Sequence, residues 1–218
     1  MQPRKCGAAL MPKYVFPLCS QTGMRTVLKC TQSIPKELSM RAQSHRCLGQ
    51  YLVSRYMGHV PKHCTQAFLI GCTQPDWNPA TYLKGSLRYE WLRGHNYRNA
   101  RHLIGKFSRR LEQKSKLHCL DYYTLGKLIH YTADAFTYAH NSGFSLRLTE
   151  HRLYEAQLQT HFLEYLRQNP HVNVHIAESI MDALRQYHED YILQAQNIQT
   201  DARYALHACC AIFTILGV

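Results

Sequence analysis

The stretch HYTADAFTYAHNSGFSLRLTEHRLYE, residues 130–155, contains three histidines, and two of its carboxylates, Asp134 and Glu155, each stand four residues after one of them. Residues four apart on a helix lie about 40° apart around its axis, on one face. His130 and Asp134 therefore form one pair of ligand-type side chains, and His151 and Glu155 form a second. The stretch predicts helices that present metal-binding groups.

Each pair needs a further ligand, because catalytic zinc takes three protein ligands and keeps one position for water. His140 is a candidate for one of them. It follows Asp134 by six residues, about 120° away around an ideal helix, so it points toward a different metal from the first pair. A single HxxxD pair is common in ordinary helices, where it forms a hydrogen bond. Two pairs with a histidine between them favour metal binding at two or more ions.

Composition predicts a folded chain with a basic exterior. The 218 residues are 45% hydrophobic, which is enough for one sizeable core. Lys and Arg number 26 against 14 Asp and Glu, a net charge of +12. This charge favours phosphates, nucleic acid or an acidic membrane surface as partners, and a solvated basic surface without a special partner explains it equally well.

The nine cysteines argue against a complete disulfide framework, because their number is odd and Cys209 and Cys210 are adjacent. We therefore expect a reducing, cytoplasmic location, with secretion as the alternative. The N-terminal region does not resemble a signal peptide, since Pro12, Lys13 and Pro17 interrupt its apolar residues. The apolar run 204–218 is shorter than the ~20 residues that span a bilayer, so we expect a buried helix and no transmembrane segment.

The chain divides at residue 40. Residues 1–39 contain four prolines and no helical period, and we expect a poorly structured N-terminal extension. Residues 40–218 are expected to form one all-α domain of about seven helices, with a multinuclear zinc site between helices. The expected helices cover residues 41–57, 67–71, 96–116, 122–140, 147–168, 175–196 and 201–216, and a turn-rich loop is expected at 74–79.

Three upstream segments extend the pattern. They are SHRCLG, which contains His45, FLIGCTQPD, which ends at Asp76, and LRGH, which ends at His95. Together with the downstream pairs, this ordered set resembles the zinc-dependent phospholipase C family, whose relatives include zinc-dependent single-strand nucleases. The resemblance covers roughly residues 44–155.

The resemblance implies two or three bound zinc ions. One zinc would be held by His95, His130 and Asp134. Asp76 would lie close to it, as an additional ligand or as the catalytic base that orients water. A second zinc would be held by His140, His151 and Glu155. A third would share Asp134 with the first and take His45 together with the amine and carbonyl of the N-terminal residue.

The chain departs from the family at its start. Members of the family expose a processed N-terminus near the first histidine, whereas here 44 residues precede His45. Met40 lies five residues before His45, which is the spacing in the nuclease branch. We expect the working protein to begin at Met40 and to lack residues 1–39.

The activity implied is that of a zinc metallohydrolase that cleaves a phosphatidylcholine-type lipid to diacylglycerol and a phosphorylated head group, with peripheral membrane contact. Trp77 and Trp91 are candidates for binding a choline head group by cation–π contacts, and packing within their loops explains them equally well. Three alternatives stay open. These are a single-strand nuclease that stacks bases on aromatic residues, a phosphoesterase for a soluble metabolite, and a zinc-binding protein without turnover.

Overall fold

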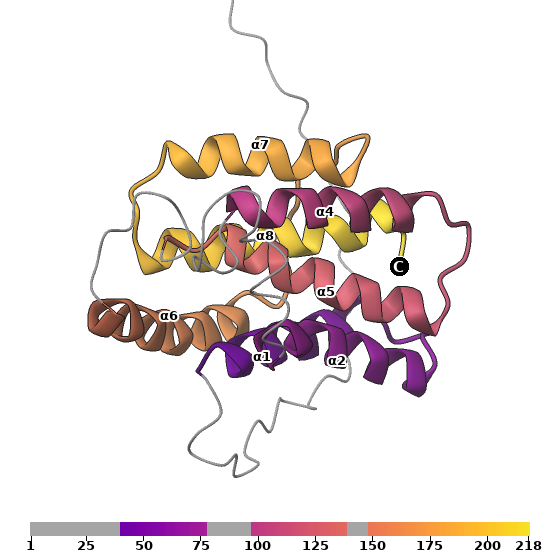
Figure 1. Ribbon diagram of the computed structural model, residues 1–218, viewed down its shortest axis with the longest axis horizontal. Coiled ribbons are helices and arrows are strands. Elements are labelled where there is room, and N and C mark those ends of the chain that lie inside the picture. The colour runs from indigo at the N-terminus through magenta and orange to yellow at the C-terminus, as the bar shows by residue number, and fades with distance from the viewer. Residues whose placement is uncertain (1–39, 78–96, 139–147) are drawn as a thin grey trace, which may run out of the picture. The chain divides into compact units, whose positions relative to one another are not determined.

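The computed structural model describes residues 40–77, 97–138 and 148–218, which lie in one compact unit, Ile34–Val218. The described residues form seven helices and no strand, so the all-α prediction is confirmed (Figure 1). The helices are α1 (Met40–Tyr56), α2 (Lys62–Trp77), α4 (Tyr97–Glu112), α5 (Cys119–Ala135), α6 (Leu148–Gln168), α7 (Ile180–Ile192) and α8 (Ile198–Leu216). Residues 1–39 lie outside the described part, and the expected division at residue 40 stays a prediction.

Helix α5 is the central element. It packs against α2, α4 and α8, and Figure 1 shows it between α2 and α4. Nearly every residue from Asp121 to Ala135 is buried, including the polar residues Thr132 and Asp134. A helix that is enclosed on all sides belongs to the core, so the ligand-type residues of α5 are held inside the protein rather than on its surface.

Two glycines let α2 and α5 approach closely. A Cβ on Gly71 would collide with the carbonyl oxygen of Tyr123, and a Cβ on Gly126 would collide with that of Phe68. Gly71 lies beside Gly126, and farther along both helices Asp76 lies beside His130. The contacts thus advance toward higher residue numbers on both helices together. The two helices therefore run parallel, and their C-terminal ends lie at the same end of the pair.

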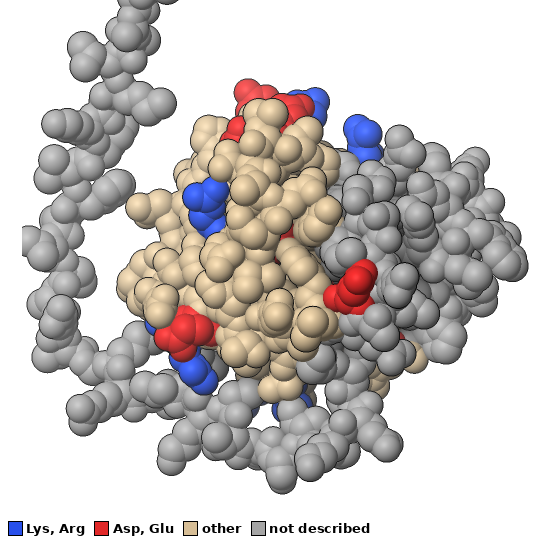
Figure 2. All heavy atoms as spheres, turned by 90° about the vertical axis from the view of Figure 1, so that its left-hand side faces the viewer, with Lys and Arg blue, Asp and Glu red and all other residues tan. Residues whose placement is uncertain are grey.

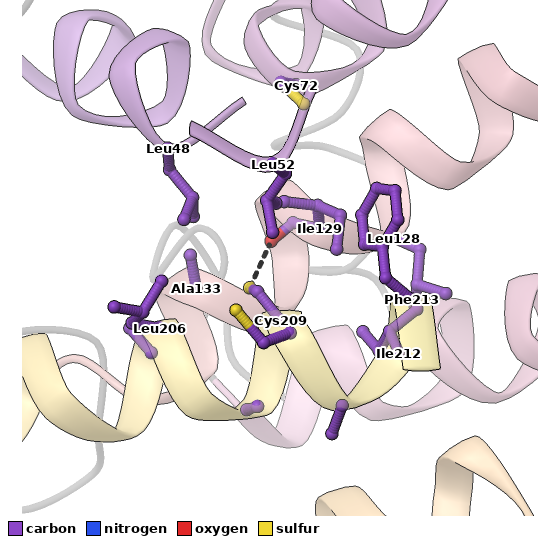
Figure 3. Packing of buried hydrophobic residues seen from close by; sticks show 14 of the residues in the cluster. Leu48, Leu52, Cys72, Leu128, Ile129, Ala133, Leu206, Cys209, Ile212 and Phe213 are labelled. Atoms are coloured by element: carbon purple, nitrogen blue, oxygen red, sulfur yellow. Dashed lines mark hydrogen bonds between the residues drawn. The ribbon is translucent and has the colours of Figure 1, made fainter. Parts of the chain in front are cut away.

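Helix α8 closes the core. Leu206, Cys209, Ile212 and Phe213 are fully buried, and Figure 3 shows them facing residues of α1, α2 and α5. The thiol of Cys209 donates to the carbonyl oxygen of Ile129 across the α5–α8 contact. The prediction of a buried helix at this position is confirmed. None of the helices in the described residues combines the length and the apolarity that a membrane span requires.

Two helix ends differ from the sequence expectations. Helix α2 continues through Pro75 to Trp77, so residues 74–77 of the expected loop at 74–79 are helical, and residues 78–79 lie outside the described residues. Pro75 has no N–H to donate to the carbonyl of Gly71, four residues earlier, so α2 lacks one backbone hydrogen bond near its C-terminal end. Helix α5 ends at Ala135 rather than at residue 140, and its chain turns tightly where the amide of Thr137 donates to the carbonyl of Asp134.

The charged residues do not gather on the face drawn in Figure 2. Among the described residues on that face, Lys and Arg side chains stand singly, with Asp and Glu nearby, and most of the surface carries neither charge. The net charge of +12 is therefore not concentrated into one basic patch in this view.

Candidate metal centre

His130 is held in a fixed orientation at the centre of the α2–α5 contact. Its Nδ1 lies 3.0 Å from the backbone carbonyl oxygen of Cys72, and the imidazole is fully buried. A carbonyl oxygen can only accept a hydrogen bond, so Nδ1 carries the proton. The other ring nitrogen, Nε2, then has its lone pair directed at whatever lies opposite. This arrangement is the one that orients metal-binding histidines in proteins.

Two carboxylates lie opposite Nε2 of His130. Oδ2 of Asp134 is 3.3 Å away and Oδ1 of Asp76 is 3.8 Å away. The other oxygen of Asp134, Oδ1, lies 3.1 Å from Nε2 of His45, a buried residue of α1. The centroids of the two imidazole rings are 4.0 Å apart. Asp134 thus has one oxygen beside each histidine, an arrangement that suits a carboxylate shared between two cations.

The spacing of these groups fits zinc. Zinc bonds of about 2.0–2.2 Å to nitrogen and oxygen place tetrahedral ligand atoms about 3.3 Å from one another. The three separations of 3.1, 3.3 and 3.8 Å bracket that value. Ligand atoms of His45, Asp76 and His130 all lie within 4.8 Å of one another. Nitrogen and carboxylate oxygen form a donor set that zinc accepts.

The helix directions favour a cation at the same place. Asp76 is the second-last residue of α2, and Asp134 is the second-last residue of α5. The C-terminal end of a helix carries a partial negative charge from its last carbonyl groups. Because α2 and α5 run parallel, both negative ends meet the two carboxylates, and this electrostatic environment stabilises bound cations.

A cavity of about 60 Å³ opens beside His45 and Asp134, and Glu155 of α6 lies in its wall. A single water needs roughly 10–15 Å³ by this measure, so the cavity has room for an ion with several waters. Glu155, expected to bind a second metal, therefore faces the same space as Asp134, expected to bind the first. The cavity is lined by Ser44, His45, Ala133, Asp134, Thr137, Glu155, Leu158, Phe162, Asp201, Ala202 and Ala205.

Asp201 supports this cavity from α8, and sequence reasoning missed it. It is 1% exposed and accepts hydrogen bonds from the amide of Tyr138 at 2.8 Å and from the hydroxyls of Tyr154 at 2.7 Å and Tyr191 at 2.8 Å. Burial and the neighbouring Asp201 raise the pKa of the Tyr154 hydroxyl well above its usual range, so it stays protonated and donates. In the sequence, a carboxylate in the first turn of an apolar helix indicates a favourable charge at a helix N-terminus. This ordinary interpretation gives no sign that Asp201 is buried and accepts hydrogen bonds from other helices.

Two cysteines lie in the core near the centre, and neither belongs to the close group of ligand atoms formed by His45, Asp76 and His130. Burial raises the pKa of the Cys72 thiol and of the Cys209 thiol well above the usual value. Neutral buried thiols behave as small apolar groups. Their place is in the core beneath the centre.

The remaining predicted residues are described to different extents. Trp77, directly after Asp76, is 61% exposed at the end of α2. His151 belongs to α6, but its side chain is not among those described. His95, His140 and Trp91 lie outside the described residues. The structure thus brings together His45, Asp76, His130 and Asp134, with Glu155 in the wall of the adjacent cavity.

Comparison with known proteins gives one match. The model of the family described as zinc-dependent phospholipase C matches residues 54–204, which include Asp76, His130, Asp134 and Glu155. His45 precedes the matched region, although its imidazole lies against Asp134. No curated protein and no solved structure matches. Because the match covers more than half of the chain, this protein belongs to the zinc-dependent phospholipase C family.

Proposed function

We propose that this protein is a zinc-dependent hydrolase that cleaves the phosphoester of phosphatidylcholine-type lipids, releasing diacylglycerol and a phosphorylated head group. One observation carries the proposal. The Cys72 carbonyl fixes His130 so that its Nε2 faces Asp134 and Asp76, with His45 on the far side of Asp134. Membership of the zinc-dependent phospholipase C family supplies the reaction class.

Two or three zinc ions are proposed for the centre. His130 and Asp134 would hold one together with His95, and Glu155 would hold another together with His140 and His151. His45 and Asp134 would hold a third. Bound zinc supplies a nucleophile from water near neutral pH and polarises the phosphoryl oxygen.

Asp76 has the role of a general base in this proposal. Its carboxylate lies at the end of α2, with Oδ1 3.8 Å from Nε2 of His130. Its side chain is 2% exposed, which protects a transferred proton from bulk solvent. Asp76 would orient the attacking water and accept its proton, a contribution of about 10²–10⁴-fold in rate.

An exposed apolar strip on α2 supports a lipid surface as the substrate. Ile70 is 57% exposed and Trp77 is 61% exposed. Residues seven apart lie about 20° from one another around a helix, so these two side chains share one face. The strip ends at the residue that follows Asp76. Trp77 would enter the head-group region of a membrane and contact a choline cation.

Three substrates distinguish the proposed function from its alternatives. Zinc-replete full-length protein is assayed against phosphatidylcholine vesicles, single-stranded DNA and a soluble phosphodiester. We expect the vesicles to be cleaved fastest, and Asp76→Asn to lower that rate by about 10²-fold or more. Faster cleavage of DNA would assign a nuclease, faster cleavage of the soluble ester a metabolite hydrolase, and no cleavage a zinc-binding protein without turnover.

The apolar strip has its own test. Trp77→Ser and Ile70→Ser should weaken sedimentation with phosphatidylcholine vesicles, whereas Leu193→Ser should not. Leu193 is a matched control because it is 80% exposed at the C-terminal end of α7. Equal vesicle binding by all three variants would contradict a lipid-facing role for this strip.

A cytoplasmic location accompanies the proposal. The nine cysteines are odd in number, and the adjacent Cys209 and Cys210 are fully buried free thiols. A cysteine set of this kind supports a reducing compartment. Detection of native disulfides in protein isolated from its source would contradict this location.

A further inference from the structure

A second group of metal-ligating side chains lies at the opposite ends of the same two helices. Ligand atoms of His63, Cys64 and Cys119 all fall within 4.8 Å of one another. Cys64 is buried, Cys119 is half-buried and His63 is exposed. Cys119 also contacts the His63 backbone, with its Sγ 3.7 Å from the carbonyl oxygen.

The cluster of His63, Cys64 and Cys119 is remote from the metal centre. Cys64 precedes Asp76 by twelve residues on α2, and Cys119 precedes His130 by eleven on α5. With a rise of 1.5 Å per residue, the two groups are about 16–18 Å apart along the helices. One ion cannot bind both groups across this distance. The cluster of His63, Cys64 and Cys119 therefore needs an explanation of its own.

Hydrogen bonds fix the backbone around the cluster of His63, Cys64 and Cys119. The amide of Cys64 donates to the carbonyl of Pro61 at 2.9 Å, which anchors the first turn of α2. At the start of α5, the amide of His118 donates to Asp121, and the Lys114 ammonium lies 2.8 Å from the same carboxylate. The glycine contact farther along then fixes one helix against the other. The three ligand atoms are thus brought together by a rigid part of the fold.

We propose that His63, Cys64 and Cys119 form a second, structural metal site that binds Zn²⁺. Zinc binds cysteine sulfur and histidine nitrogen at about 2.3 and 2.0 Å, and a set of two cysteines and one histidine with one further ligand completes its tetrahedron. A water supplies that fourth ligand. On binding, each thiol releases its proton to solvent, and the two thiolates neutralise the charge of the ion.

The position of the site suits this charge arrangement. Cys64 lies in the first turn of α2, and Cys119 is the first residue of α5. The partial positive charge at helix N-termini stabilises thiolates. The ion would clamp the starts of α2 and α5, while the carboxylate-rich centre occupies their opposite ends. The site contributes to stability and takes no part in hydrolysis.

Cobalt substitution tests the proposal on the full-length, reduced protein. A Co²⁺ ion bound by thiolate shows sulfur-to-metal charge-transfer absorption in the near ultraviolet, whereas cobalt bound by imidazole and carboxylate does not. We expect this absorption in the unsubstituted chain and a clear decrease in Cys119→Ser and in Cys64→Ser, because each variant removes one of the two thiolates. His63→Gln should weaken the binding by more than about tenfold. His59→Gln, which removes an exposed histidine four residues earlier, is the matched control and should change nothing.

The readout is independent of the proposed function, because hydrolysis can fail while the charge-transfer absorption persists, and the reverse also holds. Cys119→Ser and His63→Gln change side chains that are not fully buried, so they keep the test decisive if Cys64→Ser does not fold. Three results would overturn the proposal. These are absence of the absorption in the unsubstituted chain, equal absorption in Cys119→Ser, and a native disulfide between Cys64 and Cys119 detected by mass spectrometry without reductant.

Discussion

The hydroxyl of Tyr154 donates a hydrogen bond to Oδ2 of Asp201 at 2.7 Å, which joins α6 to α8 one residue before Glu155. The amide of Tyr138 donates to the same oxygen at 2.8 Å, two residues before His140. Asp201 therefore anchors two of the segments that carry the ligands expected for the second zinc. A supporting group of this kind orients metal ligands without touching the ion.

Replacing Tyr154 by Phe should lower the zinc affinity of the second position by about tenfold or more. The variant also loses a hydrogen bond to a carboxylate, at a cost of about 1.5–3 kcal/mol in the free energy of unfolding. Tyr191→Phe is the matched control, since Tyr191 donates to the other oxygen of Asp201 from α7. Zinc titration and urea unfolding should show similar stability losses in both variants and a larger loss of zinc affinity in Tyr154→Phe. Equal zinc affinities would contradict the supporting role.

Asp134→Ala should release more zinc than Glu155→Ala. Asp134 faces His45 with one oxygen and His130 with the other, so its loss affects two proposed ions, whereas Glu155 serves one. Metal content after dialysis measures the difference. Glu164→Ala, on an exposed position of the same helix as Glu155, should keep its full zinc content. The assignment of Asp134 as the shared ligand fails if the Asp134 and Glu155 variants retain equal amounts.

Gly71→Ala and Gly126→Ala should each destabilise the protein by about 1–3 kcal/mol or more, because the added methyl group forces α2 and α5 apart. Zinc content should fall with stability, since Asp76 and His130 stand on the separated helices. Gly105→Ala provides the control. Its Cβ would meet nothing closer than Arg109 Nη1 at 3.6 Å, so the better helix propensity of alanine should stabilise α4 by up to about 1 kcal/mol. Urea unfolding of all three variants checks the ordering.

Acidification below pH 6.5 should reduce stability through two histidines of the C-terminal helices. Burial, followed by the nearby Arg101, lowers the pKa of His188 below its ordinary value of 6.5, and burial with Arg203 does the same for His207. In this range the unfolded chain binds more protons than the native one, so the stabilisation present above pH 6.5 is lost as pH falls toward the native pKa values.

Equilibrium unfolding between pH 7 and about pH 5 measures this effect. His188→Gln and His207→Gln should each show a shallower loss of stability than the unsubstituted chain. Zinc release also lowers stability in acid, and comparison at equal zinc loading separates the two causes. His171→Gln, which replaces an exposed histidine, should follow the unsubstituted chain. Identical slopes in all variants would refute the contribution of the two buried histidines.

Local periodicity predicted much of this fold. The spacing of His130 and Asp134 placed both side chains on one helical face. In the structure Nε2 of His130 lies 3.3 Å from Oδ2 of Asp134. The apolar run at the C-terminus was correctly expected as a buried helix. These features depend on residues close together in the chain, which is where helical periodicity carries information.

Long-range packing was not accessible in the same way. The sequence does not indicate that α2 and α5 run parallel, or that Gly71 and Gly126 lie in contact, because residues 55 apart in the chain meet only through tertiary structure. Asp201 was missed for the same reason, since its partners come from α6, from α7 and from the segment after α5. The expected loop at 74–79 was wrong for residues 74–77, because turn-type residues indicate a local preference that helix packing overrides, and α2 continues to Trp77.

The glycine contact between α2 and α5 also limits which changes of length the chain can accept during evolution. An inserted or deleted residue between Gly71 and Asp76 would turn the carboxylate by about 100° around the helix axis and away from His130, however well the helix itself tolerated the change. We therefore expect related chains to vary in the identity of residues along these two helices while keeping the number of residues between glycine and ligand constant.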